Sequence, residues 1–151
     1  MSKITKVLLT GKTHTSGADS AIYSGNPEGL LNIHLTTPGN SAGREYHFDS
    51  IGAHPTAEQL FAGAWSACYS GAVGIVAKQM KVVLPANTAV EVEVDLGVGG
   101  NEYFLQARVT LFVPGIAQEA ADAIAHGADA MCPYSKATKG NIDVVLTAVT
   151  A

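Results

Sequence analysis

The chain has 151 residues, of which 47% are apolar and 15% are charged, and its formal net charge is −4. This length suits a single domain, residues 1–151, that can bury a substantial core. The negative charge and the lack of any basic run in the sequence argue against nucleic acid as a partner.

The N-terminus has no long apolar segment of the kind that a signal peptide carries, so we expect a cytoplasmic protein. Strands are predicted over residues 4–10, 21–24 and 30–36, with glycine-containing turns between them. Residues 38–54 hold several glycines and one proline early in the segment, and they predict a long irregular excursion. Long loops of this kind are often functional.

A long helix is predicted from Thr56 to about Met80. Thr56 is a suitable N-cap residue, Gln59 completes a capping-box pattern, and Glu58 places a carboxylate in the first turn, where the helix dipole favours it. The segment is apolar almost all round, with many glycines and alanines. Since polar residues interrupt it, we expect a buried central helix rather than a membrane span.

Two long strands are predicted over residues 89–98 and 102–113, joined by a glycine-rich hairpin turn. A second helix is expected over 116–130, then a short helical turn after Pro133 and a last strand over 142–149. The apolar stripe of the second helix is predicted at Ile116, Ala120, Ile124 and Ala128. This order of elements predicts an α+β fold, with an antiparallel-rich sheet packed against helices.

The sequence contains two cysteines, Cys68 within the long helix and Cys132 just before the short one. Each alone is readily explained as a small buried side chain. A cytosolic chain seldom keeps a structural disulfide, so a single possible pair points toward redox chemistry. A thiolate that reduces a peroxide becomes a sulfenic acid, and a second thiol then condenses with it. The position of Cys132 at a helix start favours a lowered thiol pKa.

A peroxide-reducing thiolate needs a cation nearby, and the chain has two arginines, Arg44 and Arg108. Arg108 falls in a predicted strand, where it serves equally well as a surface residue. Arg44 lies in the loop before the long helix, and Glu58 could orient an arginine through a paired hydrogen bond. Ten residues of helix put Glu58 about 15 Å from Cys68. Glu58 therefore serves another chain's cysteine, acts through an intermediary, or is simply a first-turn helix residue.

Other chemistries find little support in the sequence. The five histidines, which are His14, His34, His47, His54 and His126, lack the close spacing of metal ligands. No phosphate-binding loop or serine nucleophile elbow is present, and the hairpin glycines are not followed by a helix. A thiol hydrolase ranks last, because no His–acid pair is recognisable.

Two segments resemble the OsmC/Ohr family, and within it the organic hydroperoxide resistance branch. They are EQLFAGAWSAC over residues 58–68 and MCPYSKATKGNI over residues 131–142. The segments around residues 6–11 and 30–38 also look like the family. The resemblance covers nearly the whole chain.

The resemblance implies an intertwined homodimer with two long central helices and sheets outside. It implies a thiol peroxidase that acts on alkyl and fatty-acid hydroperoxides, with Cys68 as the peroxidatic thiol and Cys132 as the resolving thiol. Glu58 matches the glutamate that orients the active-site arginine across the dimer. The resemblance also implies reduction by a lipoylated protein or another dithiol, with no metal, haem or flavin and no membrane partner.

The sequence departs from the family at the arginine. The branch usually carries it in a Gly-Gly-Arg-Asp-Gly turn, whereas this chain has Ala18 at the corresponding position. Arg44 is the candidate replacement. A chain that lost this cation would be a binding or structural protein with weak peroxidase activity, which is the alternative function. The alanine- and glycine-rich surroundings of Cys68 suit an alkyl hydroperoxide better than hydrogen peroxide.

Overall fold

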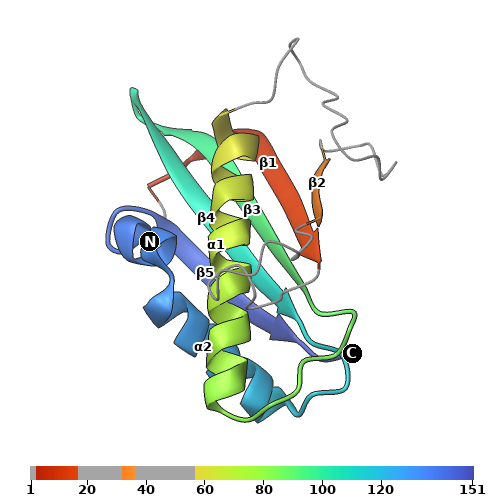
Figure 1. Ribbon diagram of the computed structural model, residues 1–151. Coiled ribbons are helices and arrows are strands. Elements are labelled where there is room, and N and C mark those ends of the chain that lie inside the picture. The colour runs from red at the N-terminus through yellow and green to blue at the C-terminus, as the bar shows by residue number, and fades with distance from the viewer. Residues whose placement is uncertain (1–2, 17–31, 37–56) are drawn as a thin grey trace.

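A computed structural model describes residues 3–16, 32–36 and 57–151 of the chain. The described elements, in chain order, are β1 (Lys6–Ser16), β2 (Asn32–Thr36), α1 (Ala57–Gln79), β3 (Ala89–Gly99), β4 (Glu102–Phe112), α2 (Gln118–Met131), α3 (Pro133–Thr138) and β5 (Asp143–Val149). This succession confirms the predicted α+β class (Figure 1). The strand expected over 21–24 and the excursion over 38–54 lie outside the described residues.

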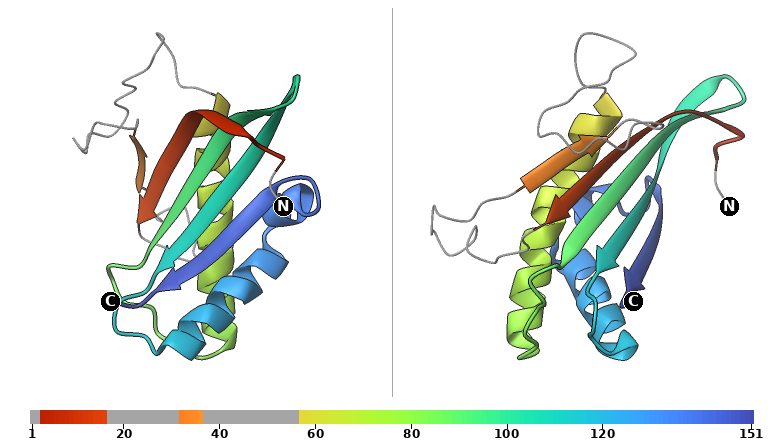
Figure 2. Two further views of the ribbon diagram at one scale, coloured as in Figure 1. Left: turned by 180° about the vertical axis from the view of Figure 1, so that it is seen from behind. Right: turned by 90° about the vertical axis from the view of Figure 1, so that its right-hand side faces the viewer.

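The described strands form one sheet in the order β2-β1-β3-β4-β5. The pairings β1–β2, β1–β3 and β3–β4 are antiparallel, and β5 lies parallel to β4. The hairpin between β3 and β4 turns at Gly100, whose φ of 63° suits glycine. Figure 2 shows the described helices packed against one face of this sheet, and none of them lies on the other face.

The first strand is longer than predicted, because it continues past Gly11 and stays paired with β3 as far as Ser16. Glycine normally weakens a strand. Here it permits a close approach, since a Cβ at Gly11 would lie 2.5 Å from the backbone of Glu58 and Gln59. Gly11 therefore lets β1 pack directly against the first turn of α1.

The helix α1 has almost the predicted bounds and supplies the centre of the core. Trp65, Tyr69 and Val73 on α1 are fully buried against strands β3 and β4 and helix α2. By length and composition α1 could cross a membrane, but 67% of its most apolar window is buried within the chain. This burial is what we expect of a core helix in a folded domain.

The described residues leave one side of α1 uncovered, and we call it the open face of α1. It contains Leu60, which is 57% exposed, the exposed Ala64 and the partly exposed Phe61 and Cys68. These residues recur at helical spacing along one side of α1. No charged residue occurs between Glu58 and Lys78, so this face lacks the charged side chains of an ordinary solvated helix surface.

The apolar stripe predicted for the second helix is partly wrong. The buried residues of α2 are Ala121, Ile124, Ala125 and Ala128. Ala120 is only partly buried and Ile116 precedes the helix. The helix begins two residues later than predicted, and it meets α1 along the line that passes Gly127, where an added Cβ would lie 2.8 Å from Val76. The face of α2 that packs against α1 is therefore shifted by about one residue from the face that the sequence periodicity predicted.

The face of the sheet that points away from the helices carries a network of hydrogen bonds around the buried carboxylate of Asp95. Arg108 donates to Asp95 from both terminal nitrogens, at 2.7 and 3.0 Å, and from Nε to Glu93 at 2.8 Å. Thr10 Oγ1 donates at 2.5 Å and Gln106 Nε2 at 2.8 Å. Burial acts to raise the pKa of Asp95, but these donors outweigh it and hold the pKa at about 2.

We therefore expect Asp95 to contribute stability at neutral pH that is lost in acid. Because its pKa is lowered in the folded state, the contribution is complete above the unfolded value of about 4 and disappears as pH falls toward 2. The free energy of unfolding should fall by on the order of 2 kcal/mol across this window through Asp95 alone. Denaturant titrations of wild type and Asp95→Asn between pH 5 and 2 measure the difference.

Glu93→Gln is the matched control, because Glu93 lies on the same strand and also pairs with Arg108 but is far more exposed. Its removal should change the acid dependence less than Asp95→Asn does. Equal effects of the two variants would contradict the special role of Asp95.

Candidate functional site

The two cysteines lie in contact although 64 residues separate them in the chain. Cys132 Sγ is 3.1 Å from Cys68 Sγ, and no disulfide joins the two sulfurs. Cys68 comes from the middle of α1 and borders its open face, while Cys132 is fully buried at the junction of α2 and α3. The pair therefore has one thiol within reach of a reagent and one behind it.

The hydrogen bond between the thiols has a direction, since Cys132 donates to Cys68. Burial raises the pKa of Cys132 to about 11, the backbone amides of Ser135 and Tyr134 oppose this rise, and the neighbouring Cys68 adds to it. The lowered pKa predicted for Cys132 is thus wrong. A helix start does favour the thiolate, but the desolvation of a fully buried sulfur outweighs it here.

The aromatic residues on either side of Cys68 tie α1 to the elements that carry Cys132. The indole nitrogen of Trp65 donates to Ser135 Oγ in α3 at 3.1 Å. The hydroxyl of Tyr69 donates to the carbonyl of Ala125 in α2 at 2.7 Å. Burial raises the pKa of Tyr69, and the nearby Asp129 and Cys132 raise it further, so the phenol stays a donor.

Glu58 lies where predicted, in the first turn of α1, and it is only 8% exposed. Since α1 is continuous from residue 57 to 79, about 15 Å of helix separates Glu58 from Cys68 of the same chain. Within the described parts of the chain, no side chain forms an ion pair or hydrogen bond with its carboxylate. A buried carboxylate of this kind calls for a cationic partner.

The two arginines differ in whether they could serve Cys68. Arg108 pairs with Asp95 and Glu93 on the face of the sheet that points away from α1. It is therefore committed to the fold and not to Cys68. Arg44, the predicted thiolate partner, lies outside the described residues, as does Ala18.

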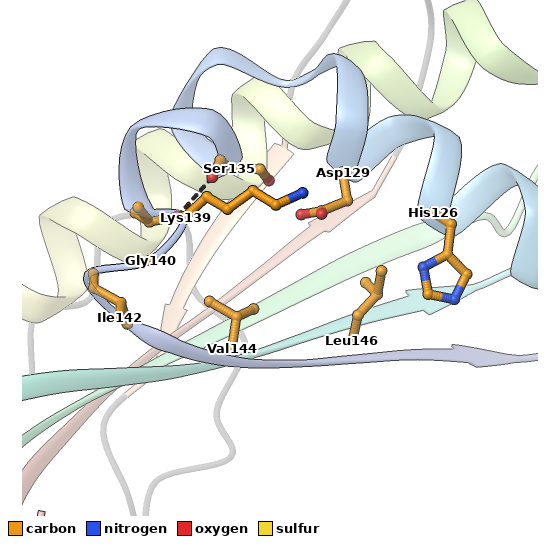
Figure 3. A pocket seen from close by; sticks show the side chains of 9 residues that line it. His126, Asp129, Ser135, Lys139, Gly140, Ile142, Val144 and Leu146 are labelled. Atoms are coloured by element: carbon orange, nitrogen blue, oxygen red, sulfur yellow. Dashed lines mark hydrogen bonds between the residues drawn. The ribbon is translucent and has the colours of Figure 1, made fainter. Parts of the chain in front are cut away.

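A cavity of about 320 Å³ lies between α2, α3 and β5 (Figure 3). Its floor is formed by Ile142, Val144 and Leu146 of the last strand and the turn before it, and Ser135 of α3 borders it. In Figure 3 the ammonium of Lys139 points toward the carboxylate of Asp129 across this space. Neither cysteine is among the residues that line the cavity.

Metal ligation has no support in the described residues, among which no group of histidine, cysteine and carboxylate side chains is arranged to hold an ion. His126, the predicted histidine whose side chain is described, is exposed at the cavity. The other four lie outside the described residues or have side chains that are not described.

A family model described as "OsmC-like protein" matches residues 49–147, which is most of the chain and includes both cysteines. The chain belongs to the OsmC-like family. This membership confirms the resemblance drawn from the two cysteine segments.

Curated relatives of this OsmC-like protein are named for organic hydroperoxide resistance. It is 34% identical to the organic hydroperoxide resistance protein of Xanthomonas axonopodis pv. citri over 143 residues, 94% of this chain and 95% of the relative. It is 32% identical over 141 residues to the organic hydroperoxide resistance protein OhrB of Bacillus subtilis, covering 92% of this chain and 96% of that one.

The OsmC-like fold is also found in solved structures. An organic hydroperoxide resistance protein from Elizabethkingia anophelis, crystallised with thiocyanate, matches with a TM-score of 0.62 at 26% identity. The match covers 98% of this chain and all of that chain. The described sheet and helices are thus those of the OsmC/Ohr fold.

Sequence reasoning did not assign a role to Trp65, Tyr69 or Ser135, although all three fall within or beside the OsmC-like motifs. The available signal was their spacing. Trp65 lies three residues before Cys68, and Ser135 lies three residues after Cys132. Helical residues three apart share a face, so both positions point toward the neighbourhood of the sulfurs.

We expect Cys132 of this OsmC-like protein to remain a thiol well above neutral pH. In Cys68→Ser, which leaves Cys132 as the single thiol, its rate of reaction with a small alkylating reagent should rise with a midpoint well above the ordinary value of about 8.5. The physical reason is burial, the largest cause of its raised pKa, which the substitution leaves intact.

The same titration in denaturant is the control, and its midpoint should return to about 8.5. A folded-state midpoint at or below that value would contradict the assignment of Cys132 as the protonated partner.

Proposed function

We propose that this protein is a thiol peroxidase that reduces organic hydroperoxides to alcohols in the cytoplasm. The contact of 3.1 Å between a partly exposed and a fully buried thiol is the observation that carries the proposal. Relatives named for organic hydroperoxide resistance, which are similar over nearly the whole chain, support the same conclusion.

In the first step, the thiolate of Cys68 attacks the distal oxygen of the hydroperoxide. The O–O bond breaks, and the alkoxide takes up a proton and leaves as the alcohol. Cys68 becomes a sulfenic acid and is oxidised by two electrons. Cys68 suits this role because it borders the open face, and because it accepts the thiol hydrogen bond from Cys132.

In the second step, the sulfur of Cys132 attacks the sulfenic sulfur of Cys68. The S–S bond forms as the S–O bond breaks, and the hydroxyl leaves with the Cys132 proton as water. A disulfide has an S–S distance of about 2.0 Å, so sulfurs that begin 3.1 Å apart need to approach by about 1 Å. Little movement of α1 or α3 is required.

In the third step, an external dithiol returns the disulfide to two thiols by exchange and becomes a disulfide itself. We propose a lipoyl dithiol, free or attached to a protein, as this reductant. The cycle then moves two electrons per hydroperoxide and needs no metal, haem or flavin.

The substrate class follows from the surroundings of Cys68. Apolar side chains of the open face, Leu60, Phe61 and Ala64, lie on the same side of the helix as Cys68. An alkyl chain that covers them gains about 25 cal/mol for each Å² of apolar surface removed from water. Hydrogen peroxide gains nothing of this kind, so we propose alkyl and fatty-acid hydroperoxides as substrates.

We further propose an intertwined homodimer in which a second copy packs along the open face of α1 and encloses with it the apolar site for the alkyl chain beside Cys68, so that two long helices lie at the centre. An uncharged helix face with Leu60 more than half exposed favours burial in an interface. The dimer would also give Glu58 a role, because a carboxylate about 15 Å from its own cysteine can serve the partner's site. There it would orient a guanidinium, for which Arg44 is the candidate.

Turnover of cumene hydroperoxide with a lipoyl dithiol tests the proposal. Wild type should consume hydroperoxide catalytically, and Cys68→Ser should lose at least three orders of magnitude because no nucleophile remains. Cys132→Ser should react once and then accumulate sulfinic acid at Cys68. Arg44→Ala should slow the first step without altering disulfide formation from the sulfenic acid.

Turnover that survives Cys68→Ser would overturn the mechanism. Wild type that binds hydroperoxides or fatty acids without consuming them would instead support the alternative, a binding protein that has kept the fold. A normal rate in Arg44→Ala would remove Arg44 from the site.

The homodimer makes a separate prediction. Ala64→Glu should yield monomers in light scattering, because a carboxylate on the open face cannot be buried without a large desolvation cost. Ala123→Glu is the matched control, since Ala123 is also an exposed helical alanine but lies on α2. A dimer that persists in Ala64→Glu, or dissociates equally in both variants, would contradict this interface.

A further inference from the structure

We infer that the hydrogen bond from Trp65 to Ser135 is a positioning device that keeps Cys132 within reacting distance of Cys68. We call this hydrogen bond the Trp65–Ser135 latch. The inference rests on the proposed thiol peroxidase function and concerns its second step, the attack of Cys132 on the sulfenic acid.

The latch joins α1, which carries Cys68, to α3, which begins directly after Cys132. Trp65 lies on α1, three residues before Cys68, and Ser135 lies on α3, three residues after Cys132. The nitrogen–oxygen distance is 3.1 Å, equal to the distance between the sulfurs. The two contacts thus lie about one helical turn apart on the same pair of elements.

Both partners of the latch are removed from water. Trp65 is fully buried and Ser135 is 4% exposed. A buried indole N–H that loses its acceptor costs more than an exposed one, because water cannot replace the missing partner. The latch therefore strongly favours one position of α3 relative to α1.

The helix α3 is short and has a cavity on one side. It is a helix of six residues, and residues Ser135 and Thr138 border the cavity between α2, α3 and β5. Figure 3 shows the open space on that side of Ser135, above the floor formed by β5. A short helix with a cavity on one side has room to move away from α1, and the latch opposes this movement.

The second step is the one that such movement would affect. The attack on hydroperoxide uses the sulfur of Cys68, and the hydrogen bond from Cys132 only assists it, whereas disulfide formation requires the two sulfurs to meet. While the sulfenic acid waits, a second hydroperoxide molecule can oxidise it to sulfinic acid. The position of α3 thus determines how the sulfenic acid divides between disulfide and sulfinic acid.

Tyr69 provides a matched comparison within the same helix. It is buried, flanks Cys68 on the other side, and donates one hydrogen bond from α1. Its acceptor is the Ala125 carbonyl in α2 rather than a group in α3. Loss of the Tyr69 bond should loosen α2, whose last turn accepts the backbone N–H of Cys132, but it leaves the bond between α1 and α3 in place, so its effect on the sulfurs should be smaller.

The test measures the hydroperoxide concentration at which half of Cys68 becomes sulfinic acid, by mass spectrometry of the full-length protein during turnover. Trp65→Phe and Ser135→Ala should each lower this concentration about fivefold, the effect expected for one lost hydrogen bond. The double variant should match the single ones, since either change breaks the same bond. Tyr69→Phe should stay within twofold of wild type.

A direct kinetic readout is available because Trp65 is the single tryptophan of the chain. After mixing with hydroperoxide, fluorescence should change in two phases, sulfenic acid formation followed by disulfide formation. In Ser135→Ala the second phase should slow about fivefold, and the first phase should slow much less. The first phase depends on hydroperoxide concentration and the second does not, which identifies them.

Wild-type sulfinic acid formation in both Trp65→Phe and Ser135→Ala would overturn the inference, and so would an equal shift in Tyr69→Phe, which would indicate a general loss of packing. These outcomes differ from a failure of the proposed function. In that case wild type itself would form neither sulfenic acid nor disulfide with hydroperoxide.

Discussion

The contact between the sulfurs of Cys68 and Cys132 is the central interaction of the candidate site. It brings together the centre of a long core helix and the junction of two shorter ones. The contact is asymmetric in both burial and hydrogen bonding, because the inner thiol is fully buried and donates to the outer one. This asymmetry assigns different chemical roles to two residues of the same type.

The fold can be understood as the support for that contact. The sheet buries one face of α1 and leaves the face that borders Cys68 open. Gly11 lets β1 approach the start of α1 and so places Glu58 in a buried position at the helix end. Trp65 and Tyr69 hold α1 against α3 and α2 on either side of the reactive sulfur. Arg108, by contrast, serves the network around Asp95 on the far face.

Local patterns predicted much of the fold. Capping and composition located α1 to within one residue at each end, and the glycine-rich turn located the β3–β4 hairpin. Long-range geometry could not be predicted in this way. The full length of β1 depends on its partner β3, and the buried face of α2 depends on where α1 meets it. Neither partner is visible in a local window of sequence.

In the candidate site, too, local features could be predicted from the sequence and long-range contacts could not. The pairing of Cys68 with Cys132 was predicted because they are the two cysteines of the chain, and the family resemblance supplied their separate roles, since 64 residues of sequence separate the two sulfurs that meet. The direction of the Cys132 pKa shift was predicted wrongly, because a helix start is visible in sequence whereas complete burial of one sulfur is not. The latch between Trp65 and Ser135 was missed for a related reason, as it joins two motifs that sequence reasoning treated separately.

The most direct test of the account is disulfide mapping after a single oxidation. Fully reduced protein receives one equivalent of cumene hydroperoxide, is alkylated in acid, digested and analysed by mass spectrometry. We predict one intrachain disulfide between Cys68 and Cys132, formed in near-stoichiometric yield with release of one equivalent of alcohol. Two unmodified thiols beside unconsumed hydroperoxide, or oxidation confined to methionine, would contradict it.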